Sequence, residues 1–183
     1  MHSRATRRRG KVTAVSFAAL PAVSHRYALL PCGASFGDGY GPVLIRAAGA
    51  GNGGTGGTVA IPGEGTTAAL LLRLYRPGVR TAAVPFDRIG PAVAAGEYAE
   101  GVLIHEGQLT YARDGLEKIE DLGAWWTRET RLPVPLGGNA VRRDLGRDLM
   151  RRVADLVHRS VAAGAAGRSP APPGATGMTI RTG

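Results

Sequence analysis

The chain has 183 residues, of which 44% are hydrophobic, and it carries a formal net charge of +9. This length is enough for one ordinary domain or two small lobes. No apolar run approaches the roughly 20 residues that a membrane-spanning helix needs, so an integral membrane protein is not expected. Cys32 is the only cysteine, which excludes an intrachain disulfide and a cysteine-based metal site and fits the cytoplasm.

The positive charge is concentrated in two segments. Five cationic residues lie within the first eleven positions, and a second group lies between residues 145 and 163, interleaved with Asp148 and Asp155. No zinc-finger spacing, aromatic RNA-binding pattern or recognition-helix motif accompanies them, so we expect no nucleic-acid partner. The basic start followed by apolar Val12–Leu20 resembles a secretory signal, but polar residues interrupt the run and favour a strand and a turn.

The first third of the chain alternates short apolar runs with turns. After a basic leader at 1–11, expected to be disordered, we predict a strand at 12–17, a short helix at 18–24, an apolar stretch at 27–31, a glycine-rich turn at 37–41, and strands at 42–46 and 58–61. The connection at 47–57 contains Gly49-x-Gly51-x-x-Gly54, the spacing of a dinucleotide-binding loop. That loop needs a helix after its third glycine. Because a strand follows here, we predict a flexible hairpin.

The rest of the chain alternates helices and strands. We predict a helix at 66–76, a strand at 79–84, a helix at 86–95, a strand at 101–104, a helix at 121–131, an extended segment at 134–142, and a last helix that Asp144 caps. Thr66 or Thr67 is the expected N-cap of the first of these helices. Residues 164–183, rich in Ala, Gly and Pro, are expected to be disordered. The alternation indicates an α/β fold with largely parallel strand pairing.

A histidine follows the buried strand at 101–104. His105 is followed by Glu106 and Gly107. In open α/β sheets, ligands bind outside the carboxyl ends of the strands. A histidine at that position can act as a general base near neutral pH.

Five motifs together carry a resemblance to a known family. They are Ser16–Pro21, Gly37–Pro42, Ile61–Leu72, Ile104–Tyr111, and Pro133–Asn139 followed by Arg142–Gly146. In this order, over about residues 12–163, they resemble the 1,4-dihydroxy-6-naphthoate synthases of the futalosine route to menaquinone. The run His-Glu-Gly-Gln-Leu-Thr-Tyr favours these lyases over the related chorismate dehydratases of the same pathway.

The resemblance implies a two-lobed fold like that of the periplasmic solute-binding proteins, with the site in the cleft. Residues 58–132 would form the smaller lobe, and 12–57 with 133–163 would form parts of the larger lobe. The family's members begin earlier and continue further than this sequence. We therefore expect a chain truncated at both ends, with an incomplete larger lobe.

The resemblance also implies the chemistry. The family cleaves cyclic dehypoxanthine futalosine into 1,4-dihydroxy-6-naphthoate and dihydroxyacetone with no known metal or organic cofactor, and His105 matches its proton acceptor. A helix that opens at Gly65-Thr66-Thr67 would offer free N–H groups and hydroxyls to the substrate carboxylate. The expected substrate-binding residues are Ala14, Ser16, Thr66, Thr67 and Ala68. Glu106 could orient His105 or satisfy loop amides, and Gly138 and Asn139 could line the cleft.

Two readings stay open beside the lyase. The chain could be a solute-binding module that closes on a small carboxylate without chemistry, or an inactive fragment of the enzyme. We expect a small-molecule substrate and no membrane partner. The sequence also allows a homodimer.

Overall fold

The computed structural model describes residues 10–50, 57–105 and 107–166. These residues fall into two compact units. The central unit comprises residues 38–134, and the flanking unit comprises residues 10–37 and 135–166 of the described chain. Each unit has its own sheet and its own buried core.

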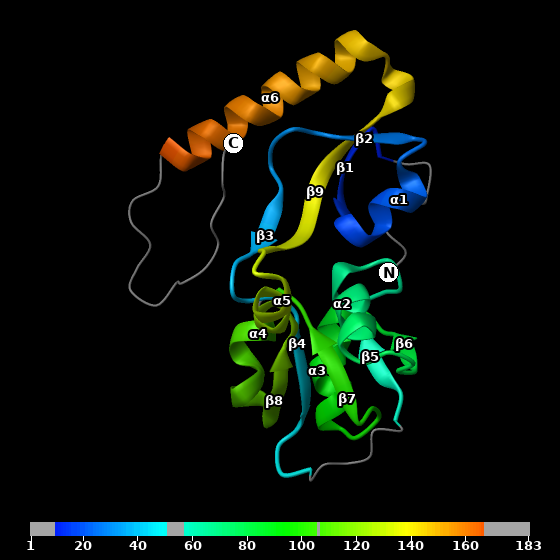
Figure 1. Cartoon of the computed structure of the whole chain (residues 1–183), viewed down its shortest axis with the longest axis vertical. Coiled ribbons are helices and arrows are strands. Elements are labelled where there is room, and N and C mark those ends of the chain that lie inside the picture. The colour runs from blue at the N-terminus through cyan, green and yellow to red at the C-terminus, as the bar shows by residue number, and fades with distance from the viewer. Residues whose placement is uncertain (1–9, 51–56, 106, 167–183) are drawn as a thin grey trace. The chain divides into compact units, whose positions relative to one another are not determined.

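A five-stranded sheet forms the middle of the central unit (Figure 1). Its strands are β4 (Val43–Ala47), β5 (Val59–Ile61), β6 (Thr81–Ala83), β7 (Glu100–Leu103) and β8 (Leu116–Asp121). They lie in the order β6-β5-β7-β4-β8. β5 pairs in parallel with β6 and β7, whereas β4 runs antiparallel to β7 and β8. The sheet is therefore mixed.

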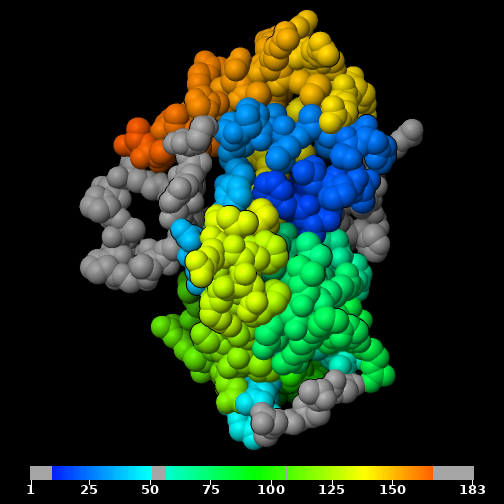
Figure 2. All heavy atoms as spheres, viewed as in Figure 1, coloured from blue at the N-terminus to red at the C-terminus, as the bar shows by residue number. Residues whose placement is uncertain are grey.

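Helices cover both faces of this sheet. Helix α3 (Phe86–Ala94) buries Ile89 and Val93 in a cluster with Val43, Ile45 and other strand residues. Strand neighbours alternate between the faces, and Leu44 and Val102 on the other face are also fully buried. Helices α2 (Thr67–Tyr75) and α5 (Leu122–Thr130) pack together there, as the space-filling view shows (Figure 2). A short helix α4 (Gly107–Thr110) and a 3-10 turn (Tyr111–Asp114) connect β7 to β8.

Two close backbone approaches require glycine in the central unit. A Cβ at Gly101 would lie 2.5 Å from a methyl of Ile89, so the missing side chain lets α3 approach β7. A Cβ at Gly123 would lie 2.2 Å from the carbonyl oxygen of Tyr40. The start of α5 can therefore cross the chain before β4 only because neither Gly123 nor Gly41 has a side chain there.

The flanking unit is built around one long strand. β9 (Val134–Arg142) pairs antiparallel with β1 (Val12–Ser16) and β2 (Tyr27–Leu29), and β3 (Ser35–Gly37) also pairs with it. A 3-10 turn (Phe17–Ala19) and helix α1 (Leu20–Val23) cover a small core that includes Val15 and Tyr27. A last 3-10 turn (Arg143–Leu145) leads to helix α6 (Arg147–Ala166), which buries no residue.

Several local expectations were wrong. The glycine-rich connection at 47–57 does not join a hairpin, because β7 lies between β4 and β5; residues 51–56 of it lie outside the described chain. The expected largely parallel pairing is confined to β5 with its neighbours β6 and β7, whereas β4 with β7 and β8, and β9 with β1 and β2, are antiparallel. Asp144 does not cap α6: it lies in the preceding 3-10 turn and forms an ion pair with Arg142.

The expected boundaries also differ from the structure at the chain ends and at residues 38–50. Residues 1–9 and 167–183, which make up most of the expected leader and tail, lie outside the described residues, and α6 includes 164–166. Residues 38–50 belong to the central unit because β4 supplies one of the middle strands of its sheet.

Candidate functional site

One edge of the central sheet gathers the loops that carry most of the candidate residues. Because β5, β6 and β7 are parallel, their carboxyl ends meet at this edge. β4 is antiparallel to β7 and β8, and its first residue Val43 pairs with both Leu103 and Asp121. The start of β4 and the end of β8 therefore lie at the same edge. We call it the site edge.

The loop after β5 leads into α2 at the site edge. Thr66 has an extended backbone and is the N-cap, as the sequence predicts. Its hydroxyl accepts a hydrogen bond from the Ala69 N–H at 3.2 Å and donates one to the Gly63 carbonyl at 2.7 Å. Thr67 and Ala68 follow in the first turn and are buried, with 6% and 3% exposure. Of the three residues, Thr66 is therefore the most accessible.

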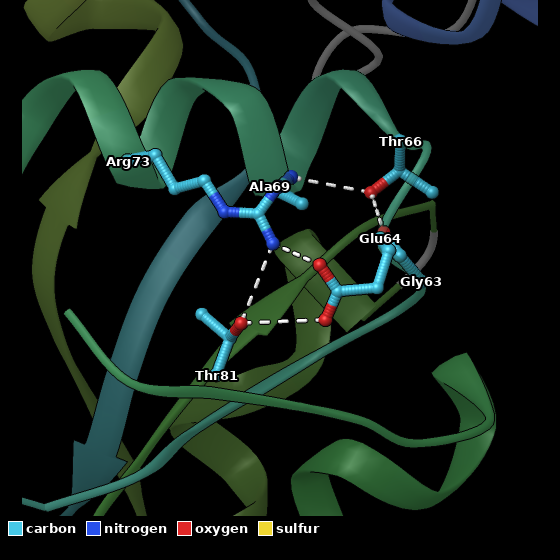
Figure 3. Close-up of polar contacts among 6 residues, drawn as sticks. All are labelled: Gly63, Glu64, Thr66, Ala69, Arg73 and Thr81. Carbon is cyan, nitrogen blue, oxygen red and sulfur yellow. Dashed lines mark hydrogen bonds and ion pairs between the residues drawn. The ribbon is translucent and has the colours of Figure 1, made fainter. Parts of the chain in front are cut away.

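A polar network holds this loop against α2 and β6 (Figure 3). One carboxylate oxygen of Glu64 forms an ion pair with Arg73 on α2. The other accepts a hydrogen bond from the Thr81 hydroxyl of β6 at 3.4 Å. Arg73 also donates to that hydroxyl at 3.5 Å. Both charged side chains are partly exposed, so the network fixes the direction of Glu64 more than it stabilises the fold.

His105 stands two residues after β7, in an unusual backbone conformation. Its φ is +58°, in the left-handed region that non-glycine residues rarely adopt. The side chain is exposed, and the imidazole packs edge-to-face on Phe86, with ring centroids 5.3 Å apart. The carbonyl of His105 accepts a hydrogen bond from the Gln108 N–H at 3.2 Å. The adjoining Glu106 lies outside the described residues.

Asp121 is a titratable residue of the site edge that the sequence reasoning passed over. It is the N-cap of α5 and accepts hydrogen bonds from the Gly123 and Ala124 N–H groups at 2.9 and 3.0 Å. Burial raises the pKa of its carboxyl, and these N–H donors oppose that shift. The helix capping pattern Asp-x-Gly-Ala, rather than any site motif, was the signal that could have found it.

Ala14 and Ser16 lie in the flanking unit, on β1. Ser16 donates a hydrogen bond to the Leu136 carbonyl at 3.5 Å. Ala14 pairs with Asn139 of β9, whose side-chain amide donates to the Gly33 carbonyl at 3.2 Å. The six sequence-predicted residues thus divide between the units: four lie at or beside the site edge, and two lie on β1.

Among the described residues, no three His, Cys, Asp or Glu side chains gather in a way that could hold a metal ion. Within the same residues, no helix is long and apolar enough to cross a membrane.

Known proteins resemble this chain in sequence and in fold. A family model described as menaquinone biosynthesis matches residues 1–173. A 1,4-dihydroxy-6-naphthoate synthase from Thermus thermophilus is 46% identical over 151 residues, which are 82% of this chain and 55% of that enzyme. The chain thus spans about half the length of the curated relatives it matches.

Solved structures with a similar fold include a relative of this chain. A crystal structure of a protein from Archaeoglobus fulgidus matches with a TM-score of 0.81 and 40% identity, covering 89% of this chain and 61% of that one. The ligand-binding component of an ABC-type import system from Staphylococcus aureus matches with a TM-score of 0.59 at 14% identity, covering 82% and 53%. That likeness concerns the fold alone, and it confirms the expected α/β fold of the solute-binding-protein type. By its match to the family model and its identity to these relatives, the chain belongs to the menaquinone biosynthesis family.

Proposed function

We propose that this chain acts as a carbon–carbon lyase that converts cyclic dehypoxanthine futalosine into 1,4-dihydroxy-6-naphthoate and dihydroxyacetone. Family membership and the name of its relatives support the reaction. The structural observation that carries the proposal is His105: an exposed imidazole in a left-handed turn at the carboxyl end of a central parallel strand. Strained, exposed conformations of this kind cluster at functional sites.

His105 is the proposed proton acceptor. A cleavage without a metal needs a base that removes a proton and thereby starts the electron shift that breaks the carbon–carbon bond. An imidazole in a turn beyond the strand end can reach a substrate that lies over the site edge. The described residues form no hydrogen bond with the ring nitrogens of His105. A substrate therefore does not have to displace one of these residues to reach the imidazole.

The start of α2 is the proposed carboxylate contact. The Thr66 hydroxyl caps the helix by donating to Gly63 and accepting from Ala69, and the first-turn N–H groups of Thr67 and Ala68 supply the partial positive charge that attracts an anion. The negative charge of Glu64 would oppose an anion here, and the ion pair with Arg73 offsets it. We assign Ala14 and Ser16 a supporting contact from β1. In this proposal, the central unit contains the smaller lobe of the enzyme and the flanking unit belongs to the larger one.

We propose a cytoplasmic enzyme that takes a small-molecule substrate, binds no nucleic acid, and could form a homodimer. The concentrated charge at 1–11 and on α6 supports no continuous nucleic-acid-binding face.

Turnover tests the proposal directly. Purified chain is incubated with cyclic dehypoxanthine futalosine, and 1,4-dihydroxy-6-naphthoate is followed by chromatography. We expect product from the wild type, a loss of at least about 100-fold in kcat for His105→Ala, and no loss for the matched control His158→Ala, an exposed histidine on α6. Binding of substrate without any product would favour the solute-binding reading. Equal rates for His105→Ala and wild type would refute the role of His105.

A further inference from the structure

The imidazole of His105 has an aromatic neighbour that could fix its direction. The side chain projects from an exposed turn, where rotamers exchange freely unless something restrains them. The ring of Phe86 lies against it with a centroid separation of 5.3 Å and an interplanar angle of 70°. This is the edge-to-face arrangement that aromatic rings prefer. Phe86 comes from a different loop, after β6, so the contact joins two strand ends.

The backbone around Phe86 is anchored to the sheet and to the core. It is the first residue of α3 and follows Pro85, whose ring restricts the backbone. The loop is tied down on both sides, because the Val84 N–H donates to Ile61 at 2.9 Å and the Arg88 N–H donates to Pro85 at 2.9 Å. One turn later, Ile89 is fully buried in the core. The half-buried Phe86 ring therefore projects from an anchored backbone beside the exposed side chain of His105.

We propose that Phe86 is a positioning residue for His105, and that its ring holds the imidazole in the direction from which it accepts the substrate proton. This inference rests on the proposed function. A base contributes fully only when its nitrogen points at the proton it removes. An aromatic pair of this geometry is worth enough to shift a rotamer equilibrium about 2- to 10-fold. The same factor is the expected loss in kcat when the ring is removed, with little change in KM because the substrate contacts lie elsewhere.

The test combines a spectroscopic and a kinetic measurement on the full chain. His105→Ala identifies the His105 ring signals among those of the four histidines in a carbon–proton correlation spectrum. Phe86→Leu keeps apolar volume at the start of α3 but removes the ring current. Phe86→Tyr keeps the ring. Tyr98→Leu is the matched control, because Tyr98 is a half-buried aromatic residue that packs against the core cluster containing Ile89, near the opposite edge of the sheet.

We expect Phe86→Leu to change the chemical shifts of the His105 ring and to lower kcat about 2- to 10-fold, whereas Phe86→Tyr and Tyr98→Leu leave both near the wild-type values. Unchanged His105 signals in Phe86→Leu would overturn the inference, whether or not the chain turns over. Wild-type kcat in Phe86→Leu, with His105→Ala inactive, would overturn it and leave the proposed function intact. Full activity of His105→Ala would instead refute the proposed function, and the positioning role with it.

Discussion

The left-handed backbone of His105 predicts that the histidine needed for activity lowers the stability of the fold. A residue with a Cβ at φ +58° carries about 1–2 kcal/mol that glycine does not. Glycine returns about 0.5–1 kcal/mol of this through the greater freedom of the unfolded chain. Since His105→Gly and His105→Ala both lose the imidazole and its contact with Phe86, their difference isolates the backbone. We expect His105→Gly to be more stable than His105→Ala by about 1 kcal/mol.

Urea unfolding followed by circular dichroism measures this difference. With a slope of about 2 kcal/mol per molar urea, the midpoint of His105→Gly should lie about 0.5 M above that of His105→Ala at equal slope. Arg131, which ends α5 at φ +58°, is the positive control and should show the same order for its Gly and Ala variants. Ala83 on β6, outside that region, should show the reverse order for Gly against the native Ala. If His105→Ala equals or exceeds His105→Gly, the backbone carries no strain and the reasoning fails.

Further predictions concern three residues: Arg73, Asp121 and Gly123. Arg73→Leu should raise KM about two- to fivefold with kcat unchanged, because it leaves the negative charge of Glu64 uncompensated near the start of α2. Adding Glu64→Gln to this variant should restore KM. A double variant with KM still raised would show that charge is not the cause. Asp121→Ala should lower the free energy of unfolding by about 1 kcal/mol through loss of the N-cap. Asp121→Asn should keep the cap. Because burial raises the pKa of Asp121 in the folded chain, the wild type loses stability as the pH rises from 3.8 through the folded pKa. In urea titrations at several pH values, the Asn variant should therefore be more stable than the wild type at pH 7 and should lose this advantage below pH 3.8. Gly123→Ala should destabilise by about 3 kcal/mol, because its Cβ would meet the Tyr40 carbonyl, whereas Gly164→Ala on α6 should not destabilise in thermal melts.

Local signals in the sequence located the elements that form the site edge. The strand before His105, the helix after Gly65 and its cap at Thr66, and the helix after Pro85 are confirmed in position. Each depends on residues within one or two turns of the chain: an apolar run, a hydroxyl at the N-cap, or a proline before a helix. The fold class was also predictable, through the resemblance carried by five motifs.

The strand order was not predictable from the same signals. β4 and β5 are neighbours in sequence, yet β7 is inserted between them, and β8 then pairs antiparallel on the far side of β4. Side-chain alternation records which face of a strand is buried but not which strand lies beside it. The segment that forms β8 has two adjacent charged residues on each side of Ile119, so it lacks a continuous apolar run and was missed.

The backbone conformation of His105 and its contact with Phe86 were also not predictable from the sequence. Nothing local to His105 indicates a positive φ, and Phe86 is 19 positions away along the chain, brought close only because β5 places β6 and β7 on its two sides. The link from Glu64 to Thr81 likewise crosses from one strand end to the next. Long-range pairing creates these contacts, so a single sequence without its structure does not show them.

Chemical rescue tests the central claim most directly. In His105→Gly the imidazole is removed, the left-handed turn is unstrained, and space opens at the position of the missing ring. We predict that His105→Gly forms almost no 1,4-dihydroxy-6-naphthoate by itself and that added free imidazole restores product formation with saturation, while His158→Gly needs no rescue. Wild-type product formation by His105→Gly without imidazole would contradict the account, because the proton would then be accepted elsewhere.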